Sequence, residues 1–508
     1  MSVGLGERLE PADVVAVAGG AAVAFGDGAR ARVAAARAVI DDAVASGETI
    51  YGVTTGFGAL AHTRVEPSQA STLQHGIVRS HATAVGTPLP REEARAMMLL
   101  RAHVLALGHS GVRPEVVDLM VSMLNEDVIP AVPQQGSLGA SGDLAPLANL
   151  ALPLIGDGAV LTPEGGLEPA GAAMVRAGLT TLTLEAKEGL ALVNGTQGML
   201  AIGIIATERA ATLARTADVV AALTIEASLG TDRPFDERLQ ALRPHPGQAA
   251  SASNLRRLLA GSPVLASHRD STHLVQDAYS LRCAPQVHGA SRDALAYVRE
   301  VLRIEANSVS DNPIVLPGGD VVAGGNFHGQ PVAVALDTVA TALVSLASIS
   351  ERRLYRLLDE HQSNGLPPFL VHGAGLNSGF MLVQYTAASL VSECKSLAHP
   401  ASVDSIPSSA GQEDHVSMGM TSARHAREVV ANAETVLALE ALGAAQALDL
   451  RAPLEPGPAT RAVHDTIRSR VPFFDADREF GPDIAGAVAL VREGGLVAAA
   501  EAAVGTLA

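Results

Sequence analysis

The sequence predicts an all-α fold: an elongated bundle of long central helices with a loop-rich N-terminal part and minor β-hairpins. Nearly half of the 508 residues are hydrophobic, yet tryptophan is absent and aromatic residues are scarce. Cores must therefore be filled by Ala, Val and Leu, whose modest side chains let helices pack closely. Apolar residues also recur every three or four positions over long segments, and no repeat or charged linker separates independent domains.

The N-terminal part, residues 1–210, is expected to hold short helices separated by glycine-rich turns. Helices are predicted over 31–45, 91–107 and 115–124. The last of them follows Pro114, a residue favoured at the first position of a helix. The apolar pairs around residues 160–161 and 167 predict a hairpin.

Residues 211–508 are expected to hold the long-helix bundle and a C-terminal helical region, in one cooperative unit with the N-terminal part. One helix face is indicated by apolar residues three or four positions apart: Val430, Ala433, Leu437, Ala441, Ala444 and Leu448. Pro453 ends this pattern. A second hairpin is predicted between 314–316 and 321–322, across a Pro-Gly-Gly-Asp turn.

The formal net charge of −17 at pH 7 disfavours nucleic acid and anionic membrane surfaces as partners. Only Cys283 and Cys394 are present, too few for a disulfide framework, and the first residues lack the apolar segment of a signal peptide. We therefore expect a cytoplasmic protein. The most apolar stretch, 331–350, is interrupted by Asp337 and several hydroxyl residues, so it predicts a buried core helix rather than a membrane span.

Residues 136–150, GSLGASGDLAPLANL, form a glycine-rich loop that runs into an apolar helix predicted to begin near Leu144, with Asp143 as its cap. A phosphate-binding loop would need a Lys-Ser or Lys-Thr pair after its last glycine, and the segment lacks one. A nucleophile elbow would need Gly-x-Ser-x-Gly, but Asp143 stands where the second glycine should be. An ordinary capped helix start is the structural alternative.

Backbone cyclisation is a third functional interpretation of this loop. The Gly142 nitrogen would attack the Ala140 carbonyl, and loss of water there and from Ser141 would leave a methylene conjugated to a carbonyl, which is an electrophile. A side chain on residue 142 would obstruct the approach of its nitrogen, and only a residue that loses a β-leaving group can supply the alkene. Spacing and residue types fit, although Ala-Ser-Gly alone occurs in many ordinary turns.

Six further motifs accompany this triplet: YGVTTGFGALA (51–61), LVNGTQG (192–198), VQDAYSLRCAPQVHG (275–289), SVSDNP (308–313), GGNFHG (324–329) and QEDHVSMG (412–419). With the triplet they cover most of the chain, in the order in which the histidine and aromatic ammonia-lyases carry similar motifs, so the sequence resembles that family. The resemblance implies that Ala140, Ser141 and Gly142 form 4-methylidene-imidazole-5-one (MIO), with no external cofactor. It also implies a homotetramer in which several subunits build each active site.

The activity that the resemblance implies is elimination of ammonia from L-histidine to give trans-urocanate, the first step of histidine degradation. Tyr51 would be the base for the β-proton, and because a free phenol has a pKa of about 10, it would need the positive field of nearby helix N-termini. Asn194 would orient the carbonyl of the electrophile, and Tyr279 would support this group and the substrate. Arg282 would bind the substrate carboxylate through two parallel hydrogen bonds. A buried tyrosine and a structural salt bridge are the alternatives for Tyr51 and Arg282.

Substrate choice is expected to rest on Ser80, His81 and Glu413. Members of the family that act on phenylalanine or tyrosine usually carry Phe-Leu or His-Leu at the first pair and glutamine at the last. An imidazole ring has a donor and an acceptor to satisfy, and a site that does so disfavours a phenyl ring. His81 alone could be an ordinary core histidine. Three further assignments complete the set: Gln276 and Asn312 as supporting hydrogen-bonding residues and Phe327 in the ring pocket.

Several alternatives remain open. An ammonia-lyase acting on phenylalanine or tyrosine, or an aminomutase, would share every reacting residue. A helical scaffold or binding protein with the same fold would leave Ser141 as ordinary peptide. The sequence also leaves open whether the electrophile attacks the amine or the imidazole ring. The histidines of 268–273, His288 and His328 lack metal-ligand spacing, so no metal site is predicted.

Overall fold

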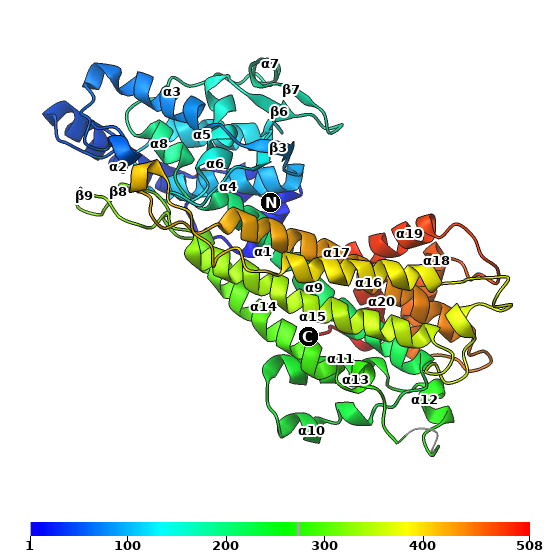
Figure 1. The fold of residues 1–508 in the computed structure, drawn as a ribbon. Helices are drawn as coiled ribbons and strands as arrows, with labels where there is room; N and C mark the ends of the chain where they lie inside the picture. The colour runs from blue at the N-terminus through cyan, green and yellow to red at the C-terminus, as the bar shows by residue number, and fades with distance from the viewer. Residues whose placement is uncertain (1, 272–274) are drawn as a thin grey trace. The chain divides into compact units, whose positions relative to one another are not determined.

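Helices make up most of the structure, a computed structural model that describes residues 2–271 and 275–508 (Figure 1). In these residues the chain forms 20 α-helices and 9 strands of two to four residues each. The predicted all-α fold with minor β-structure is therefore confirmed. The chain divides into two compact units, each built from three segments of the sequence.

Unit 1 comprises Met1–Ile205, Arg299–Asp337 and Pro400–Arg424. Its complete helices are α1 (Pro11–Ala18), α2 (Asp27–Ser46), α3 (Ala70–His81), α4 (Arg91–Ala106), α5 (Pro114–Asn125), α6 (Leu144–Ala151), α7 (Ala170–Arg176) and α8 (Glu188–Val193). Its strands are β1 (Val3–Gly4), β2 (Val23–Ala24), β3 (Val85–Pro88), β4 (Ile129–Pro130), β5 (Pro133–Gln135), β6 (Ala159–Leu161), β7 (Leu167–Pro169), β8 (Ile314–Val315) and β9 (Val321–Val322).

Helix α4 forms the core of unit 1. It is buried from Glu93 to its last residue, Ala106, and it packs against α1, α2 and α5. Helices α3, α6 and α8 pack against one another, and the loops that follow β5 and α8 extend from this group. These loops of unit 1 therefore extend from a group of packed helices.

The short elements predicted for unit 1 are confirmed. The predicted helices correspond to α2, α4 and α5, although α2 begins earlier than its apolar pattern because its first turn is polar. Strands β6 and β7 pair with Leu161 opposite Leu167, and β8 and β9 pair with Val315 opposite Val321. Strand β4 adds a third member to the first hairpin.

Unit 2 comprises Ala206–Val298, Thr338–His399 and His425–Ala508. Its complete helices are α10 (Glu237–Ala241), α11 (Pro246–Leu258), α12 (Pro263–Ser267), α13 (Tyr279–Arg282), α16 (Met381–Leu397), α18 (Pro458–Arg470), α19 (Gly481–Arg492) and α20 (Gly495–Val504). Four long helices have residues in both units: α9 (Gln197–Ala227), α14 (Ala284–Ala306), α15 (Gln330–Leu358) and α17 (Gly419–Asp449). The apolar face predicted from spacing lies in α17, which ends before Pro453. The division near residue 210 and folding as one cooperative unit stay predictions.

Helix α15 contains the most apolar stretch of the sequence. By length and composition alone it could cross a membrane, and no other helix in the described ranges meets that criterion. However, 61% of its most apolar window is buried within the protein. The carboxylate of Asp337, inside this helix, accepts a hydrogen bond from the Ser402 backbone N–H at 2.9 Å. These features agree with the predicted core helix.

Candidate active site

The triplet Ala140-Ser141-Gly142 lies in a tight loop between β5 and α6. Ser141 and Gly142 both have positive φ angles, 49° and 78°. A Cβ atom on Gly142 would lie 2.0 Å from the Gly195 carbonyl oxygen, so only glycine fits this position. The close approach of a second loop is therefore another physical reason why residue 142 must be small.

Gly195 holds the loop on both sides of Gly142. Its N–H donates to the Ser141 carbonyl at 3.1 Å, and its own carbonyl accepts from the Asp143 N–H at 2.7 Å. Gly195 lies in the short connection between α8 and α9. Two segments far apart in the sequence are thus joined at the triplet, and the backbone of 141–143 is held in its turn.

Asp143 caps a different helix from the one predicted. It makes no side-chain cap on α6, which follows it directly; instead its carboxylate accepts the N–H of Met199 at 2.7 Å, in the first turn of α9, and the Ser137 hydroxyl at 2.9 Å. Asp143 does occupy the N-cap position of α6, as predicted, but its side chain bonds the first turn of α9 instead. Burial raises the pKa of Asp143 to about 6, while the bonds from Met199, Ser137 and Gly198 oppose that rise. The N-terminus of α9 therefore lies beside the triplet, as does that of α6.

The Asn194 side chain has both of its donors engaged. Its amide nitrogen donates to the Asp311 carboxylate at 3.2 Å and to the Asn312 carbonyl at 3.0 Å. Because both partners can only accept, the orientation of the amide is determined by its surroundings. Its oxygen is buried and meets no partner in the described part of the chain. Asn194 thus presents a buried, unsatisfied acceptor, and its role toward the electrophile stays a prediction.

Two buried cations lie behind Asn194, and sequence reasoning missed both. Arg101 donates to the Asn194 carbonyl at 2.7 Å and to the Gln197 side-chain oxygen at 2.8 Å. Lys187 pairs with Asp311 at 2.9 Å, and both side chains are fully buried. Burial lowers the pKa of Arg101 to about 10 and also lowers that of Lys187, whereas Asp311 raises both. The position of Arg101 inside the apolar run of α4 is the sequence signal that could have indicated a buried cation.

Tyr51 lies in the loop that follows α2, and its hydroxyl accepts the Gly58 N–H at 2.9 Å. Burial raises the pKa of Tyr51, and the charge of Glu413 raises it further, while the bond from Gly58 lowers it. The net effect is a raised pKa, opposite to the shift that a base at neutral pH needs. In the single chain, the expected positive field of helix N-termini therefore does not outweigh the effects of burial and of Glu413 on the pKa of Tyr51.

A cavity of about 260 Å³ brings two residues of the triplet, Ala140 and Gly142, together with the predicted specificity residues. Its lining includes Ser80, His81, Thr83, Gly136, Ser137, Leu138, Ala140, Gly142, Leu144, Ala145, Ser408 and Glu413. Burial lowers the pKa of His81, against the raising effects of the Ile77 carbonyl and of Glu413. Ser408, which sequence reasoning missed, donates its hydroxyl proton to Glu413 at 2.7 Å. The cavity therefore combines the loop that carries the triplet with polar groups of both hydrogen-bonding kinds.

Five predicted residues of unit 1 are not among those that line this cavity: Tyr51, Ser141, Asn194, Asn312 and Phe327. Asn312 acts through its carbonyl, which accepts from Asn194, and its side-chain oxygen accepts the Gly324 N–H at 2.8 Å. Phe327, between β9 and α15, is half-buried.

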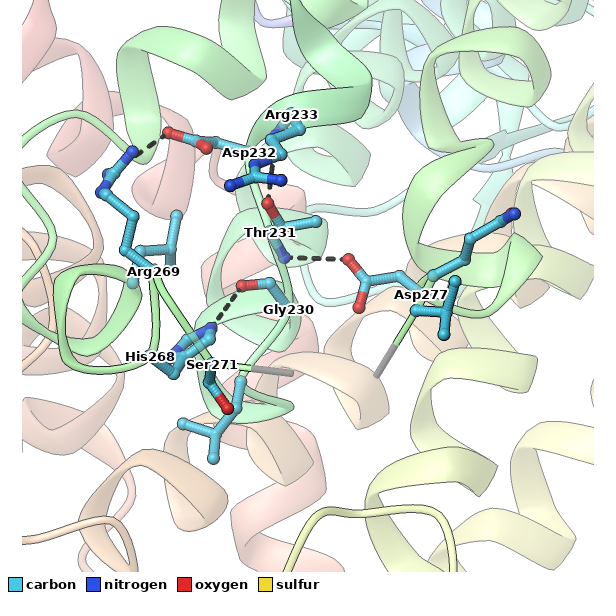
Figure 2. Close-up of a pocket in the computed structure, with 12 residues that line it drawn as sticks. Gly230, Thr231, Asp232, Arg233, His268, Arg269, Ser271 and Asp277 are labelled. Atoms are coloured by element: carbon cyan, nitrogen blue, oxygen red, sulfur yellow. Dashed lines mark hydrogen bonds and ion pairs between the residues drawn. The ribbon is translucent and has the colours of Figure 1, made fainter. Parts of the chain in front are cut away.

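The remaining predicted residues, Gln276, Tyr279 and Arg282, belong to unit 2. The Arg282 guanidinium lies over the Tyr279 ring, 4.6 Å from its centre, and Tyr279 is 71% exposed. Gln276 lines a pocket of about 120 Å³, part of which Figure 2 shows, where Asp277 accepts the Thr231 N–H at 2.8 Å. Within unit 2, Tyr279 and Arg282 therefore contact each other, and Gln276 lines a separate pocket.

No cluster of three or more His, Cys, Asp or Glu side chains within residues 2–271 and 275–508 could hold a metal ion. His288 instead donates its Nδ1–H to the Asp218 carboxylate, 2.7 Å away, in a buried network of unit 2. His328 contacts the His415 carbonyl at 3.1 Å. His273 lies outside the described residues.

The chain is similar to known proteins over nearly its whole length. A model of the aromatic amino acid lyase family matches residues 9–469. The histidine ammonia-lyase of Anaeromyxobacter sp. (strain K) is 55% identical over 500 residues, which cover 97% of this chain and 98% of that protein. The histidine ammonia-lyase of Sorangium cellulosum (strain So ce56) is 54% identical, with 99% of each chain covered.

Two solved structures have nearly the same fold. Histidine ammonia-lyase from Trypanosoma cruzi matches with a TM-score of 0.92 at 44% identity, covering 99% of this chain and 96% of that chain. Tyrosine aminomutase from Streptomyces globisporus matches with a TM-score of 0.94 at 40% identity, covering 99% of both chains.

Proposed function

This chain belongs to the aromatic amino acid lyase family, and on that premise we propose that it eliminates ammonia from L-histidine to give trans-urocanate, the first step of histidine degradation. It is thus a carbon–nitrogen lyase. The observation that carries the proposal is the unit 1 cavity, in which His81 and Glu413 face the same space as two residues of the triplet. An imidazole ring needs both a donor and an acceptor, and these side chains can supply both.

The residues of the triplet fit the MIO group. The loop excludes a Cβ at Gly142 and holds Ser141 at a φ of 49°. Asn194, whose side-chain oxygen has no partner among the described residues, directly precedes Gly195, the residue that bonds this loop. MIO would supply an electrophile that withdraws electrons from the bound amino acid. We propose that it forms from Ala140, Ser141 and Gly142 alone, with loss of two water molecules and without an external cofactor.

Tyr51 is proposed to take the β-proton of the substrate. Its hydroxyl is already positioned by the Gly58 N–H. Because burial and Glu413 raise the pKa of Tyr51, deprotonation needs a cation beside this hydroxyl. The ammonium group of the substrate can provide that charge. Asn194 is proposed to orient the carbonyl of the electrophile and Asn312 to support Asn194, with Phe327 against the substrate ring.

Arg282 is proposed to bind the substrate carboxylate, with Tyr279 and Gln276 beside it. As the family resemblance implies, the proposal includes a homotetramer whose subunits together build each site. Exposed apolar side chains support such assembly: Val275, Leu376, Leu382, Tyr385 and Val403. We place the enzyme in the cytoplasm, with a small-molecule substrate and without nucleic acid or membrane as partner.

An aminomutase is the second candidate, because the chain also has nearly the fold of a tyrosine aminomutase. An ammonia-lyase acting on phenylalanine or tyrosine is the third. All three would use the same reacting residues, so product analysis must separate them.

The test is turnover of L-histidine, L-phenylalanine and L-tyrosine in separate reactions, followed by the ultraviolet absorption of each conjugated acrylate. Urocanate from histidine alone supports the proposal. Cinnamate or coumarate, or a β-amino acid detected by chromatography, would contradict it. Ser141→Ala is the control, since it lacks the β-leaving group: it should fold, show the unmodified mass of its own sequence at the triplet, and give no product.

A further inference from the structure

The two carboxylate oxygens of Glu413 have different surroundings. Oε2 accepts a hydrogen bond from the Ser408 hydroxyl at 2.7 Å. Oε1 makes no hydrogen bond with any residue that the structure describes, and it lies 3.9 Å from the position of a Cβ built on Gly58, in the Tyr51 loop. Since Glu413 and Ser408 both line the cavity, Oε1 is the oxygen left for a ligand.

The backbone holds Ser408 and Glu413 opposite each other. The Ser408 N–H donates to the Glu413 carbonyl at 2.9 Å, and the Glu413 N–H donates to the Ser408 carbonyl at 3.3 Å. Between them the chain turns through Ser409, Ala410 and Gly411, with φ angles of 50°, 53° and 86°. This strained turn keeps the Ser408 hydroxyl beside the carboxylate.

The same turn is fixed to the loop that carries Tyr51. The Ser409 hydroxyl accepts the Ala59 N–H at 3.0 Å, and the neighbouring Gly58 N–H donates to the Tyr51 hydroxyl at 2.9 Å. The position of Glu413 relative to Tyr51 is therefore set by hydrogen bonds rather than by free rotation of the turn.

We propose that Ser408 is a positioning residue for substrate selection: its hydroxyl holds Glu413 so that Oε1 faces the ring of the bound amino acid. The inference rests on the proposed function and names how that site selects its ring. A glutamate side chain loses considerable rotamer freedom when it is fixed. Because Ser408 fixes the carboxylate before substrate arrives, a ring N–H meets an acceptor already in place. A phenyl ring would leave that oriented charge without a partner.

The first experiment compares Ser408→Ala with the wild type on L-histidine and L-phenylalanine. We expect KM for histidine to rise about tenfold and kcat to change less than about threefold, because only ring binding is weakened. The preference for histidine over phenylalanine, measured as the ratio of kcat/KM values, should fall by about tenfold. Ser402→Ala, which removes a hydroxyl of the same segment that makes no hydrogen bond among the described residues, should leave all three quantities unchanged.

A matched pair isolates the hydroxyl from the size of the side chain. Ser408→Thr keeps the donor and Ser408→Val has nearly the same shape without it, so the threonine variant should retain histidine preference and the valine variant should lose it. The valine pair also keeps the test informative if Ser408→Ala fails to fold. In a Glu413→Ala background, Ser408→Val should add less than about a twofold change, because its effect acts through Glu413.

Unchanged KM and preference in Ser408→Ala or Ser408→Val would overturn the inference, as would equal losses in the threonine and valine variants. If the wild type itself gives no product from histidine, the proposed function fails, and the inference fails with it. If the wild type turns over histidine and Ser408→Val leaves KM and the histidine preference unchanged, the inference fails and the proposed function stands.

Discussion

Gly195→Ala should both destabilise unit 1 and prevent the triplet from maturing. A Cβ atom at this position would lie 2.4 Å from the Gln197 side-chain oxygen, 2.5 Å from an Arg101 guanidinium nitrogen and 2.8 Å from the Ser310 carbonyl. Overpacking of this kind costs about 1–3 kcal/mol. The φ angle of +154° adds backbone strain of about 1–3 kcal/mol.

The free energy of unfolding should therefore fall by about 2–6 kcal/mol, a large share of the about 5–15 kcal/mol typical of a folded protein. Displacing the segment would also loosen its bonds to Ser141 and Asp143, so the triplet should keep the mass of two water molecules. Denaturant titration measures the first effect and mass spectrometry of the tryptic peptide measures the second.

Gly178→Ala is the matched control, because its φ is +69° and a Cβ there would meet nothing within 4 Å. It should cost only the strain of a left-handed alanine, about 1–2 kcal/mol, and leave the triplet processed. A Gly195→Ala protein as stable as Gly178→Ala, with a fully processed triplet, would refute the reasoning.

Three further outcomes follow from the site. Tyr51→Phe should retain the processed triplet and lose at least about a hundredfold in kcat; retained turnover would remove Tyr51 as the base. Asp143→Asn should stabilise the protein most at neutral pH. Burial raises the pKa of Asp143 from 3.8 to about 6, so the ionised carboxylate destabilises the folded state, and asparagine carries no such charge. Its advantage over the wild type, up to about 3 kcal/mol by denaturant titration, should shrink as pH falls from above about 6 to below about 4, and a constant difference would contradict this. Lys187→Met should cost about 3–5 kcal/mol by leaving the buried Asp311 charge unpaired, and Lys187→Met with Asp311→Asn should recover part of that loss.

The sequence predicts the helical elements well because each depends on local spacing. The apolar face of α17 and the prolines near helix ends are visible without knowledge of neighbours. Both hairpins are visible for the same reason, since Gly-rich turns separate their apolar pairs. The beginning of α2 is less visible because its first turn is polar and lies outside the apolar pattern.

The candidate site is only partly visible in the sequence. Motif likeness identifies Ser80, His81 and Glu413, and the structure places all three around one cavity with two residues of the triplet. Ser408 carries no motif, and its contact with Glu413 arises from a turn with three positive φ angles, which no local residue pattern specifies.

Long-range contacts explain the other differences. Asp143 caps α9 rather than α6 because the loop folds against residues that follow much later in the chain. The cations Arg101 and Lys187 gather behind Asn194 only after three separate segments meet. The spacing of residues along the chain does not reveal such tertiary contacts.

The two bonds that Gly195 makes to the triplet loop join segments that lie far apart in the sequence. Gly195 is synthesised well after Gly142, and its two bonds to the triplet loop form only when the connection between α8 and α9 reaches that loop. On the proposed chemistry, a nascent or misfolded chain carries an inert peptide at 140–142. On that chemistry the methylene would arise only once these segments have met, so folding would protect the unfinished chain from reaction with thiols.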